Sequence, residues 1–246
     1  MNSIYTNTYP VVNLYKKKLL KSKIVTQMIY GESFEIINRS SKWMKIRIKE
    51  DKYIGYIIKK KFRSYLKPTH KVSVLSANIY RESNLKNKIG KLPYVSKIKI
   101  EKIISKFAKF QNKWIEIKNI KPIKYKDKNF FKDIQIFKNI KYKWGGKTFD
   151  GIDCSALIQI CLNFNNIFCP RDTGQQVNFF KKNINLKNIK KNDIIYWKGH
   201  VALVISNKKL IHAYGPTKKT IIMDIQKTIE LIKKTANLKV ISIKRI

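Results

Sequence analysis

Short stretches in which apolar and polar residues alternate fill residues 1–123, and they constrain the fold of this half more than any other feature. Alternation with period two is typical of β-strands that bury one face. We expect strands at five places: Phe34/Ile36, Met44/Ile46/Ile48, Val72/Val74, Ile98/Ile100 and Ile115/Ile117. Almost no other pattern occurs there, so this half is predicted to be all-β.

Two segments of this half share one pattern. Residues 41–47 and 112–118 each run polar, Lys, Trp, apolar, charged, Ile, basic, and they start about 70 residues apart. That spacing indicates a duplicated unit. Pro68 lies between the two copies, and proline suits a linker or a strand edge because it lacks a backbone donor. We therefore expect two β-domains, over residues 1–66 and 67–123.

The pattern changes after residue 124. Residues 156–163 are predicted to form a helix, because an apolar stripe runs at helical spacing through Cys154, Leu157, Ile158, Cys161 and Leu162. Apolar strands are expected at residues 194–197, 201–205, 210–214 and 240–243. A helix on an antiparallel sheet gives an α+β domain over residues 124–246.

Cys154 is the first candidate for chemistry. Two glycine turns followed by Asp153-Cys154-Ser155 place the thiol at the first turn of the helix, where unpaired amides favour thiolate. A lone cysteine there is more often structural. His200 and His212 lie on or beside two successive strands, and a cysteine nucleophile needs an imidazole that a third polar group orients.

The two histidines flank a predicted hairpin. A two-residue turn at Asn207-Lys208 would place Leu203 opposite His212 and leave His200 on the other face of the sheet. For the two rings to meet, we expect an odd-length loop, a β-bulge, or His200 just before the regular strand.

A series of motifs in residues 142–214 resembles the NlpC-type papain-like cysteine peptidases, which cut peptidoglycan peptides. The matching residues are Tyr142, Trp144-Gly145-Gly146, Asp153-Cys154-Ser155, Pro170-Arg171-Asp172-Thr173, Gly199-His200-Val201 and His212. Thr173 replaces the usual serine, and Asn192-Asp193 stands where Gly-Asp is usual. The N-terminal half resembles two bacterial SH3-like domains, on segments 30–32 and 51–57 for the first and 76–81 and 89–93 for the second.

This resemblance implies a papain-like catalytic domain behind two small SH3-like β-barrels. It implies that Cys154 attacks the amide carbonyl, that His200 accepts and returns the proton, and that His212 orients His200. The backbone amide of Cys154 and the hydroxyl of Tyr142 would bind the oxyanion. No cofactor is expected.

Two SH3-like domains before such a catalytic domain resemble the γ-D-glutamyl-L-diamino acid endopeptidases that recycle muropeptides. In those enzymes the first SH3-like domain narrows the cleft, so that only a free N-terminal L-alanine fits. The resemblance implies substrate contacts for seven residues: Asp153, Ser155, Asp172, Thr173, Trp144, Glu32 and Tyr53. Simpler roles stay open, with Asp153 as a helix cap and Glu32 as a solvated turn residue.

Three alternatives compete with this peptidase hypothesis. Zinc could be bound by a set drawn from Cys154, Cys161, Cys169, His200 and His212. No Cys-x-x-Cys pair occurs, however, and Cys161 and Cys169 are predicted to be small buried apolar residues, so no metal is expected. The chain could also be an inactive wall-binding or ligand-binding module, or an amidase or acyltransferase on the same scaffold.

The net charge of +39 raises the question of nucleic acid. Only six of the 54 basic residues are Arg, the preferred reader of phosphates, and the abundant Lys, Ile, Asn, Tyr and Phe all have A/T-rich codons. We expect a peptide substrate, no nucleic acid or membrane partner, and a monomer.

The first residues lack the order of a signal peptide, no apolar run reaches about 18 residues, and the three cysteines form no disulfide framework, so a cytoplasmic location is expected.

Overall fold

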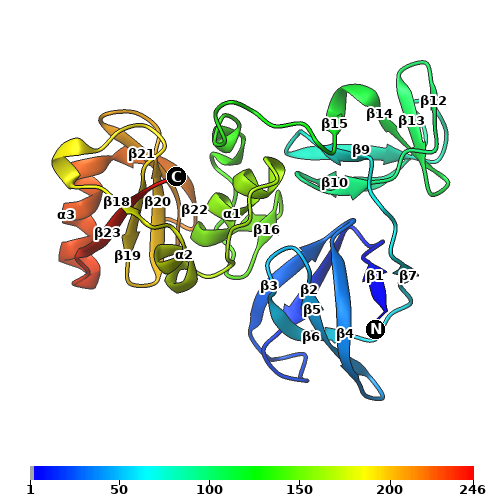
Figure 1. Ribbon diagram of the computed structural model, residues 1–246, viewed down its shortest axis with the longest axis horizontal. Helices are drawn as coiled ribbons and strands as arrows, with labels where there is room; N and C mark the ends of the chain where they lie inside the picture. Colours follow the sequence, from blue (N-terminus) through cyan, green and yellow to red (C-terminus); the bar gives the residue numbers. More distant parts are fainter. Residues whose placement is uncertain (1–2) are drawn as a thin grey trace. The chain divides into compact units, whose positions relative to one another are not determined.

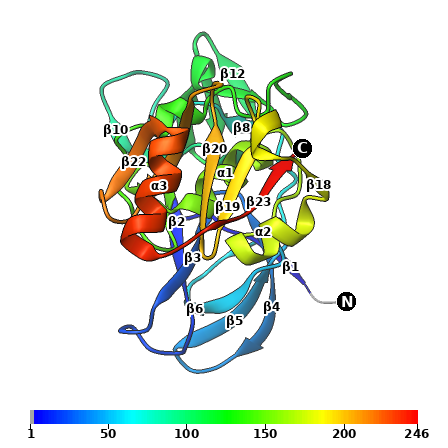
Figure 2. The same ribbon diagram turned by 90° about the vertical axis from the view of Figure 1, so that its left-hand side faces the viewer.

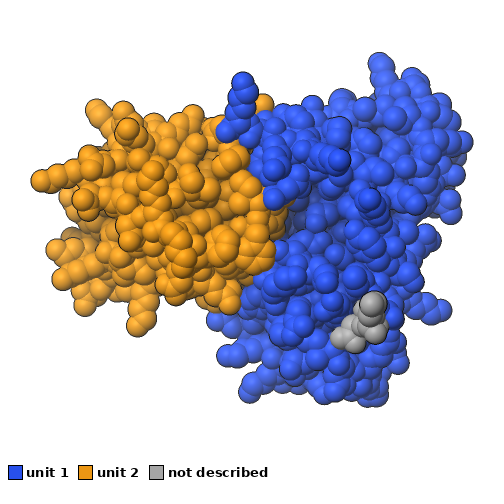
Figure 3. All heavy atoms as spheres, in the orientation of Figure 1, with its two compact units in different colours: residues 1–128, 147–149, 164–166 blue, residues 129–146, 150–163, 167–246 orange. Residues whose placement is uncertain are grey.

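The computed structural model describes residues 3–246, which divide into two compact units (Figure 3). Unit 1 extends to Lys128 and also includes residues 147–149 and 164–166, and unit 2 contains the remaining residues from 129 onward. The predicted domain boundaries after residues 66 and 123 stay predictions.

Unit 1 begins with a seven-stranded antiparallel sheet, which we name the first β-subdomain (Figure 1). Its strands are β1 (Ile4–Thr6), β2 (Val11–Tyr15), β3 (Ile24–Ile29), β4 (Ser33–Arg39), β5 (Trp43–Ile48), β6 (Ile54–Ile58) and β7 (Arg63–Ser64). They lie in the order β3-β2-β6-β5-β4-β1-β7. On β5, Met44, Ile46 and Ile48 are buried while the residues between them are not, so the alternation predicted from the sequence is confirmed.

The second β-subdomain contains two sheets, in the orders β10-β9-β14-β13-β12 and β11-β8-β15. Its strands are β8 (His70–Val72), β9 (Ser76–Tyr80), β10 (Lys88–Pro93), β11 (Lys97–Ile98), β12 (Lys102–Ile104), β13 (Phe107–Phe110), β14 (Lys113–Glu116) and β15 (Ile120–Pro122). A short 3₁₀ turn, Ile117–Asn119, separates the last two strands. The core includes Val72, Phe110 and Ile115, and Tyr30 from the first β-subdomain joins it. The two tryptophans of the repeated pattern lie on corresponding strands, Trp43 on β5 and Trp114 on β14.

Unit 2 is built on a six-stranded antiparallel sheet in the order β18-β23-β19-β20-β21-β22. The strands are β18 (Lys182–Asn183), β19 (Ile194–Trp197), β20 (His200–Val204), β21 (Lys209–Tyr214), β22 (Lys219–Asp224) and β23 (Val240–Arg245). The helices are α1 (Cys154–Phe164), α2 (Thr173–Phe179) and α3 (Ile225–Ala236). Helices α1 and α3 lie on opposite sides of the sheet (Figure 1, Figure 2).

The predicted α+β architecture of this region agrees with these elements. The helix expected over residues 156–163 is present and starts two residues earlier, at Cys154. The four expected strands are β19, β20, β21 and β23. Helices α2 and α3 and strand β22 were not predicted, although Asp224 caps α3 and Asn237 ends it with a left-handed φ of 51°.

The remaining short elements are β16 (Lys147–Thr148), β17 (Gly151–Ile152) and two 3₁₀ turns, Ile134–Phe137 and Leu186–Asn188. No helix among residues 3–246 is long and apolar enough to cross a bilayer.

Candidate active site

Cys154 is the first residue of α1, and its side chain is almost fully buried. Backbone N–H groups of Val201 and Ser155 donate hydrogen bonds to its sulfur. Val201 directly follows His200 at the start of β20, so the nucleophile candidate meets the strand that carries the base candidate. The N-terminal turn of α1 therefore brings the thiol to the edge of the histidine hairpin.

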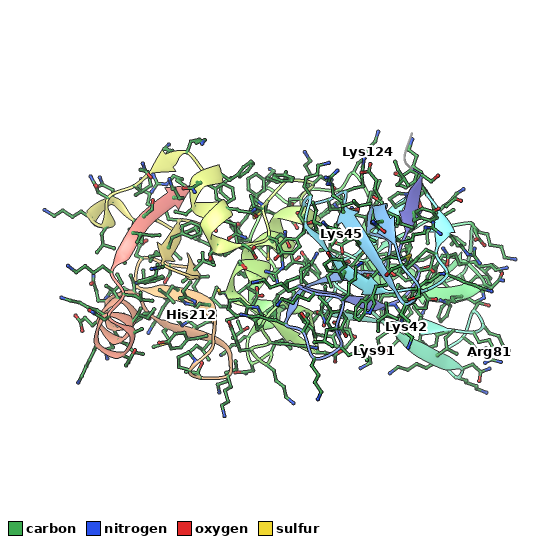
Figure 4. All side chains as sticks on the ribbon, turned by 90° about the horizontal axis from the view of Figure 1, so that it is seen from below. Lys42, Lys45, Arg81, Lys91, Lys124 and His212 are labelled. Carbon is green, nitrogen blue, oxygen red and sulfur yellow. The ribbon has the colours of Figure 1, made fainter. Side chains whose placement is uncertain are left out.

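His200 and His212 are in direct contact across this hairpin, with Nε2 of His200 2.9 Å from Nδ1 of His212. The ladder pairs Leu203 with Ile211, and the N–H of Ile205 donates to the carbonyl of Lys209. Three residues, 206–208, remain in the loop, so the predicted odd-length loop is confirmed. This register puts both imidazoles on one face of the sheet, and Figure 4 labels His212 there.

The contact between the two rings is compatible with one pair of tautomers that suits a general base. His200 uses Nε2 for His212, so a proton from the Cys154 thiol would have to go to its Nδ1. If Nδ1 is to accept a proton, Nε2 must carry the hydrogen and donate it to Nδ1 of His212. His212 is then protonated on Nε2, which faces the sulfur of Met223 at 3.4 Å. The chain of donors therefore runs from His200 through His212 to a thioether.

Burial keeps this pair neutral in the substrate-free site. Desolvation raises the pKa of the Cys154 thiol to about 12, and the neighbouring Asp153 acts in the same direction. Desolvation lowers the pKa of His200 to about 4. The N–H of Ser155, at the helix terminus, lowers the pKa of the thiol as expected. Burial raises this pKa by more, so the thiol stays protonated. The thiol proton therefore has to move to His200 during attack rather than before it.

Tyr142 lies close enough to Cys154 for the two groups to interact electrostatically. Burial raises the pKa of its phenol, so the hydroxyl stays protonated and able to donate at neutral pH. Its backbone N–H donates to the carbonyl of Lys218 at 2.8 Å, which anchors the tyrosine beside the sheet. The predicted role in binding the oxyanion stays a prediction.

We expect Tyr142→Phe to lower kcat by about 30- to 150-fold with little change in KM, because a lost oxyanion donor raises the barrier by about 2 to 3 kcal/mol. Steady-state kinetics on the peptide substrate would test this expectation. Tyr214→Phe is the matched control, since Tyr214 stacks on His212 through its ring at 4.7 Å. Equal losses in both variants would contradict a specific role for the Tyr142 hydroxyl.

Asp153, Arg171 and Ser155 form a buried polar cluster beside the nucleophile. The Asp153 carboxylate accepts hydrogen bonds from both terminal nitrogens of Arg171, at 2.9 and 2.6 Å. It also accepts the N–H of Ala156 at 2.9 Å, which caps α1, and the N–H of Gly145 at 2.8 Å. Arg171 donates to Oγ of Ser155 at 2.9 Å. The cluster thus holds the glycine turn, the start of α1 and Arg171 in one arrangement.

Sequence reasoning assigned no role to Arg171. The side chain is only 1% exposed, and its planar guanidinium makes two parallel bonds to one carboxylate, a geometry that lysine does not provide. The rarity of arginine could have indicated this role, because Arg171 is one of only six arginines among 54 basic residues. In a chain this rich in lysine, an arginine inside a motif points to a need for bidentate geometry.

The other motif residues of unit 2 lie around this cluster. Asp172 is exposed and precedes α2, and its carbonyl, not its side chain, accepts the first bonds of that helix. Thr173 is half-buried, and Trp144 is 53% exposed. The substrate contacts assigned to Asp153, Ser155, Asp172, Thr173 and Trp144 stay predictions.

Glu32 and Tyr53 belong to unit 1. Glu32 is 3% exposed, and its two oxygens accept from Nζ of Lys147 at 2.8 Å and from the N–H of Ile29 at 2.7 Å. It is therefore a buried partner in an ion pair and not a solvated turn residue. Tyr53 is partly buried and packs against the core of the first β-subdomain. The substrate roles assigned to both residues stay predictions.

The cysteines and histidines give no sign of a metal site. No group of three or more His, Cys, Asp or Glu side chains in the described part of the chain is arranged to hold a metal ion. Cys161 and Cys169 are buried and form no disulfide, at 1% and 0% exposure. Their burial agrees with the prediction that both are small buried apolar residues, Cys161 on the helix stripe and Cys169 beside Pro170.

The buried histidines should make folding sensitive to acid. The folded-state pKa values of His200 and His212 are lowered to about 4 and about 3, below the ordinary value of 6.5. The unfolded chain therefore binds more protons below pH 6.5, and stability falls as pH falls towards 4. We expect the free energy of unfolding to drop by roughly 3 kcal/mol per histidine between pH 7 and pH 4.

Urea unfolding at several pH values would measure this slope. His212→Gln should reduce it, and His70→Gln, a change in a less buried histidine of unit 1, should leave it nearly unchanged. A slope that is the same in all three proteins would contradict the neutral histidine pair.

Comparison with known proteins places these features in context. The family model described as "NlpC/P60 family" matches residues 139–237, and the model "Bacterial dipeptidyl-peptidase Sh3 domain" matches residues 14–61. A dipeptidyl-peptidase 6 from Lysinibacillus sphaericus is 36% identical over 72 residues, which cover 29% of this chain and 27% of that protein. The match thus spans well under half of that relative's length.

Two longer matches extend over both units. A γ-D-glutamyl-L-lysine dipeptidyl-peptidase from Bacillus subtilis (strain 168) is 24% identical over 238 residues, covering 84% of this chain and 77% of that protein. The crystal structure of an NlpC/P60 family protein from Bacillus cereus ATCC 10987 has a TM-score of 0.83 with 16% identity and covers 99% of both chains, which shows a shared fold. Residues 139–237 of this chain therefore form an NlpC/P60 domain, the domain of a family of peptidases, and residues 14–61 before it form a bacterial dipeptidyl-peptidase SH3 domain.

Proposed function

We propose that the chain is a cysteine endopeptidase that cleaves the bond between γ-D-glutamate and an L-diamino acid in peptidoglycan-derived peptides with a free N-terminal L-alanine. The observation that carries the activity is the contact between His200 and His212 beside the buried thiol of Cys154. The bond specificity rests on the B. subtilis relative, whose name states this reaction for a γ-D-glutamyl-L-lysine substrate. We also propose that the second β-subdomain is an SH3-like barrel.

In the proposed reaction, Sγ of Cys154 attacks the γ-carbonyl carbon of the D-glutamyl residue. The thiol proton passes to Nδ1 of His200, and the positive charge on that ring is shared through Nε2 with Nδ1 of His212. Collapse of the tetrahedral intermediate breaks the amide C–N bond, and His200 returns the proton to the leaving α-amine. Water then hydrolyses the thioester with His200 as base, which releases L-Ala-γ-D-Glu and restores the thiol.

The exposure of each motif carboxylate decides which one the substrate's ammonium can reach. Asp153 is buried and its charge is balanced by Arg171, so a second cation there would gain little. Glu32 is likewise balanced by Lys147. Asp172 follows Arg171 directly and is exposed, so a substrate can reach it. We therefore assign the ammonium to Asp172, with Asp153 and Arg171 supporting its position.

The proposal is tested by product analysis on the tripeptide L-Ala-γ-D-Glu-L-Lys and on its meso-diaminopimelate counterpart. We expect L-Ala-γ-D-Glu and the free diamino acid to appear in equal amounts, without added metal. The α-linked isomer, L-Ala-α-D-Glu-L-Lys, is the matched control and should stay intact. No cleavage of either γ-linked peptide, or cleavage before the glutamate, would overturn the assigned specificity.

Such peptides carry a free amine only after they leave the glycan. We therefore propose a role in recycling wall fragments in the cytoplasm rather than in digesting intact wall. Comparing the turnover of soluble peptide with the release of peptide from purified sacculi would test this role, and substantial release from sacculi would contradict it.

A further inference from the structure

We propose that the tip of the β2–β3 hairpin in the first β-subdomain is a contact site for the surface of a bilayer that contains anionic phospholipid. The hairpin tip consists of residues 16–21, Lys-Lys-Lys-Leu-Leu-Lys. It joins β2 to β3, and Figure 2 shows it as a dark blue loop extending beyond the strands. This proposal is independent of the peptidase activity and departs from the sequence-based expectation of no membrane partner.

The hairpin tip exposes two adjacent leucines. Leu19 is 56% exposed and Leu20 is 66% exposed, the largest value among the large apolar residues of the described chain. Single exposed apolar side chains are common on soluble proteins and need no explanation. Two neighbouring leucines at the end of a projecting hairpin are different, because both can enter the acyl boundary of a bilayer together while the strands stay outside.

The charges around these leucines have one sign. Four of the six residues are lysine and none is acidic, whereas basic residues are 54 of 246 in the whole chain. Lysine is frequent along the whole sequence, and Figure 4 labels Lys42, Lys45, Lys91 and Lys124 as examples, so net charge alone identifies no partner. Two exposed leucines flanked by lysines do point to a partner, because lysines at an anionic lipid surface strengthen the insertion of neighbouring apolar side chains. A soluble polyanion would use the lysines but not the leucines.

A hollow next to the hairpin tip supports the choice of a phospholipid. It has a volume of about 150 Å³ and is lined by Lys18, Asn38, Ser40, Trp43, Lys45 and Tyr56. The ammonium groups of Lys18 and Lys45 lie 5.8 and 6.0 Å from the ring centre of Tyr56. The two lysine cations and the Asn38 amide suit a phosphate group, whereas the Ser40 hydroxyl already donates to the carbonyl of Trp43. Trp and Tyr favour the interface between water and lipid. A head group can therefore occupy the hollow while Leu19 and Leu20 reach the acyl chains.

Vesicle sedimentation with the full chain tests the proposal. We expect binding at 0.15 M salt to vesicles of phosphatidylcholine with about a third phosphatidylglycerol, and weak binding to pure phosphatidylcholine. Leu19→Ser with Leu20→Ser should lower the partition coefficient at least about tenfold. Lys17→Gln, Lys18→Gln and Lys21→Gln together should lower it by about 100-fold, at roughly fivefold for each charge. Activity on the tripeptide should not change.

Matched variants separate the hairpin tip from the general charge of the protein. Leu85→Ser removes one leucine that is 62% exposed in the second β-subdomain. Lys86→Gln and Lys88→Gln in that subdomain, with Lys124→Gln just after it, remove three exposed charges. We expect each of these controls to lower binding less than about threefold, since distant exposed charges are screened. Circular dichroism would confirm that all variants fold alike.

Three results would overturn the proposal. One is no binding to the anionic vesicles, and another is an equal loss for the tip lysines and the control lysines, which would show diffuse attraction of a polycation. The third is unchanged binding after both leucines are replaced. Weaker vesicle binding in the presence of millimolar glycerol phosphate would support a head group in the hollow. Binding of glycerol phosphate without any binding to the anionic vesicles would be the first of these three results and would identify a soluble phosphate as the ligand.

Discussion

Cys154→Ser should retain less than about a thousandth of the wild-type kcat/KM, because a serine hydroxyl is a far weaker nucleophile than a thiol in this site. The site offers no strong base to compensate, since burial lowers the pKa of His200 to about 4. Steady-state kinetics on L-Ala-γ-D-Glu-L-Lys would measure the loss. The thermal midpoint should change by only a few degrees, because sulfur and oxygen occupy the same small buried space.

The matched control is Cys161→Ala, two turns further along α1 and equally buried. This variant leaves a small cavity and should lose stability, by about 1 kcal/mol, but keep most of its activity at temperatures where it is folded. Activity above about a tenth of wild type in Cys154→Ser, with the control behaving as expected, would exclude Cys154 as the nucleophile.

N-acetylation of the substrate alanine should lower kcat/KM by about 30- to several-thousand-fold. Acetylation removes the ammonium that Asp172 should bind once the bound peptide covers this carboxylate, and loss of one partner of a charged contact that binding buries typically costs roughly 2 to 5 kcal/mol. Kinetics on matched free and acetylated peptides would measure the ratio. Equal kcat/KM values for the two peptides would contradict both the ammonium site and the recycling role, even if Cys154 is catalytic.

The assignment of the ammonium to Asp172 predicts a specific change in that ratio. Asp172→Asn should lose at least about tenfold on the free-amine peptide and less than about threefold on the acetylated one. Glu230→Gln on α3 removes the same charge from an exposed position of unit 2 and should change neither value. If Asp172→Asn impairs both peptides equally, its effect is structural and the ammonium lies elsewhere.

The sequence predicted those parts of the site that depend on local pattern. The apolar stripe through Leu157 and Cys161 located α1, and the short apolar runs located β19, β20 and β21. For His200 and His212 to meet, the register allowed an odd-length loop, a β-bulge or a position of His200 before the strand, and residues 206–208 form the odd-length loop. Asn192, where glycine is usual, has a φ of 74°, a left-handed conformation that asparagine tolerates better than most residues.

Properties that depend on burial and on contacts between distant residues could not be predicted in this way. The helix terminus favoured a thiolate at Cys154, but the enclosure that raises its pKa comes from residues far along the chain. The bidentate contact between Asp153 and Arg171 joins positions 18 residues apart, and the contact between Glu32 and Lys147 joins positions 115 apart. Such pairings follow from the tertiary fold, which periodicity alone does not encode.

The most direct test of the central claim is to find which atom forms the covalent bond with the γ-glutamyl group. A chloromethyl ketone that carries L-Ala-γ-D-Glu places an electrophile where the scissile carbonyl would lie, and peptide mapping by mass spectrometry locates the adduct. We predict one adduct, on Cys154, that appears in step with loss of activity and is prevented by the tripeptide. Full inactivation with Cys154 unmodified, or with the adduct on Cys161 or Cys169, would contradict the account.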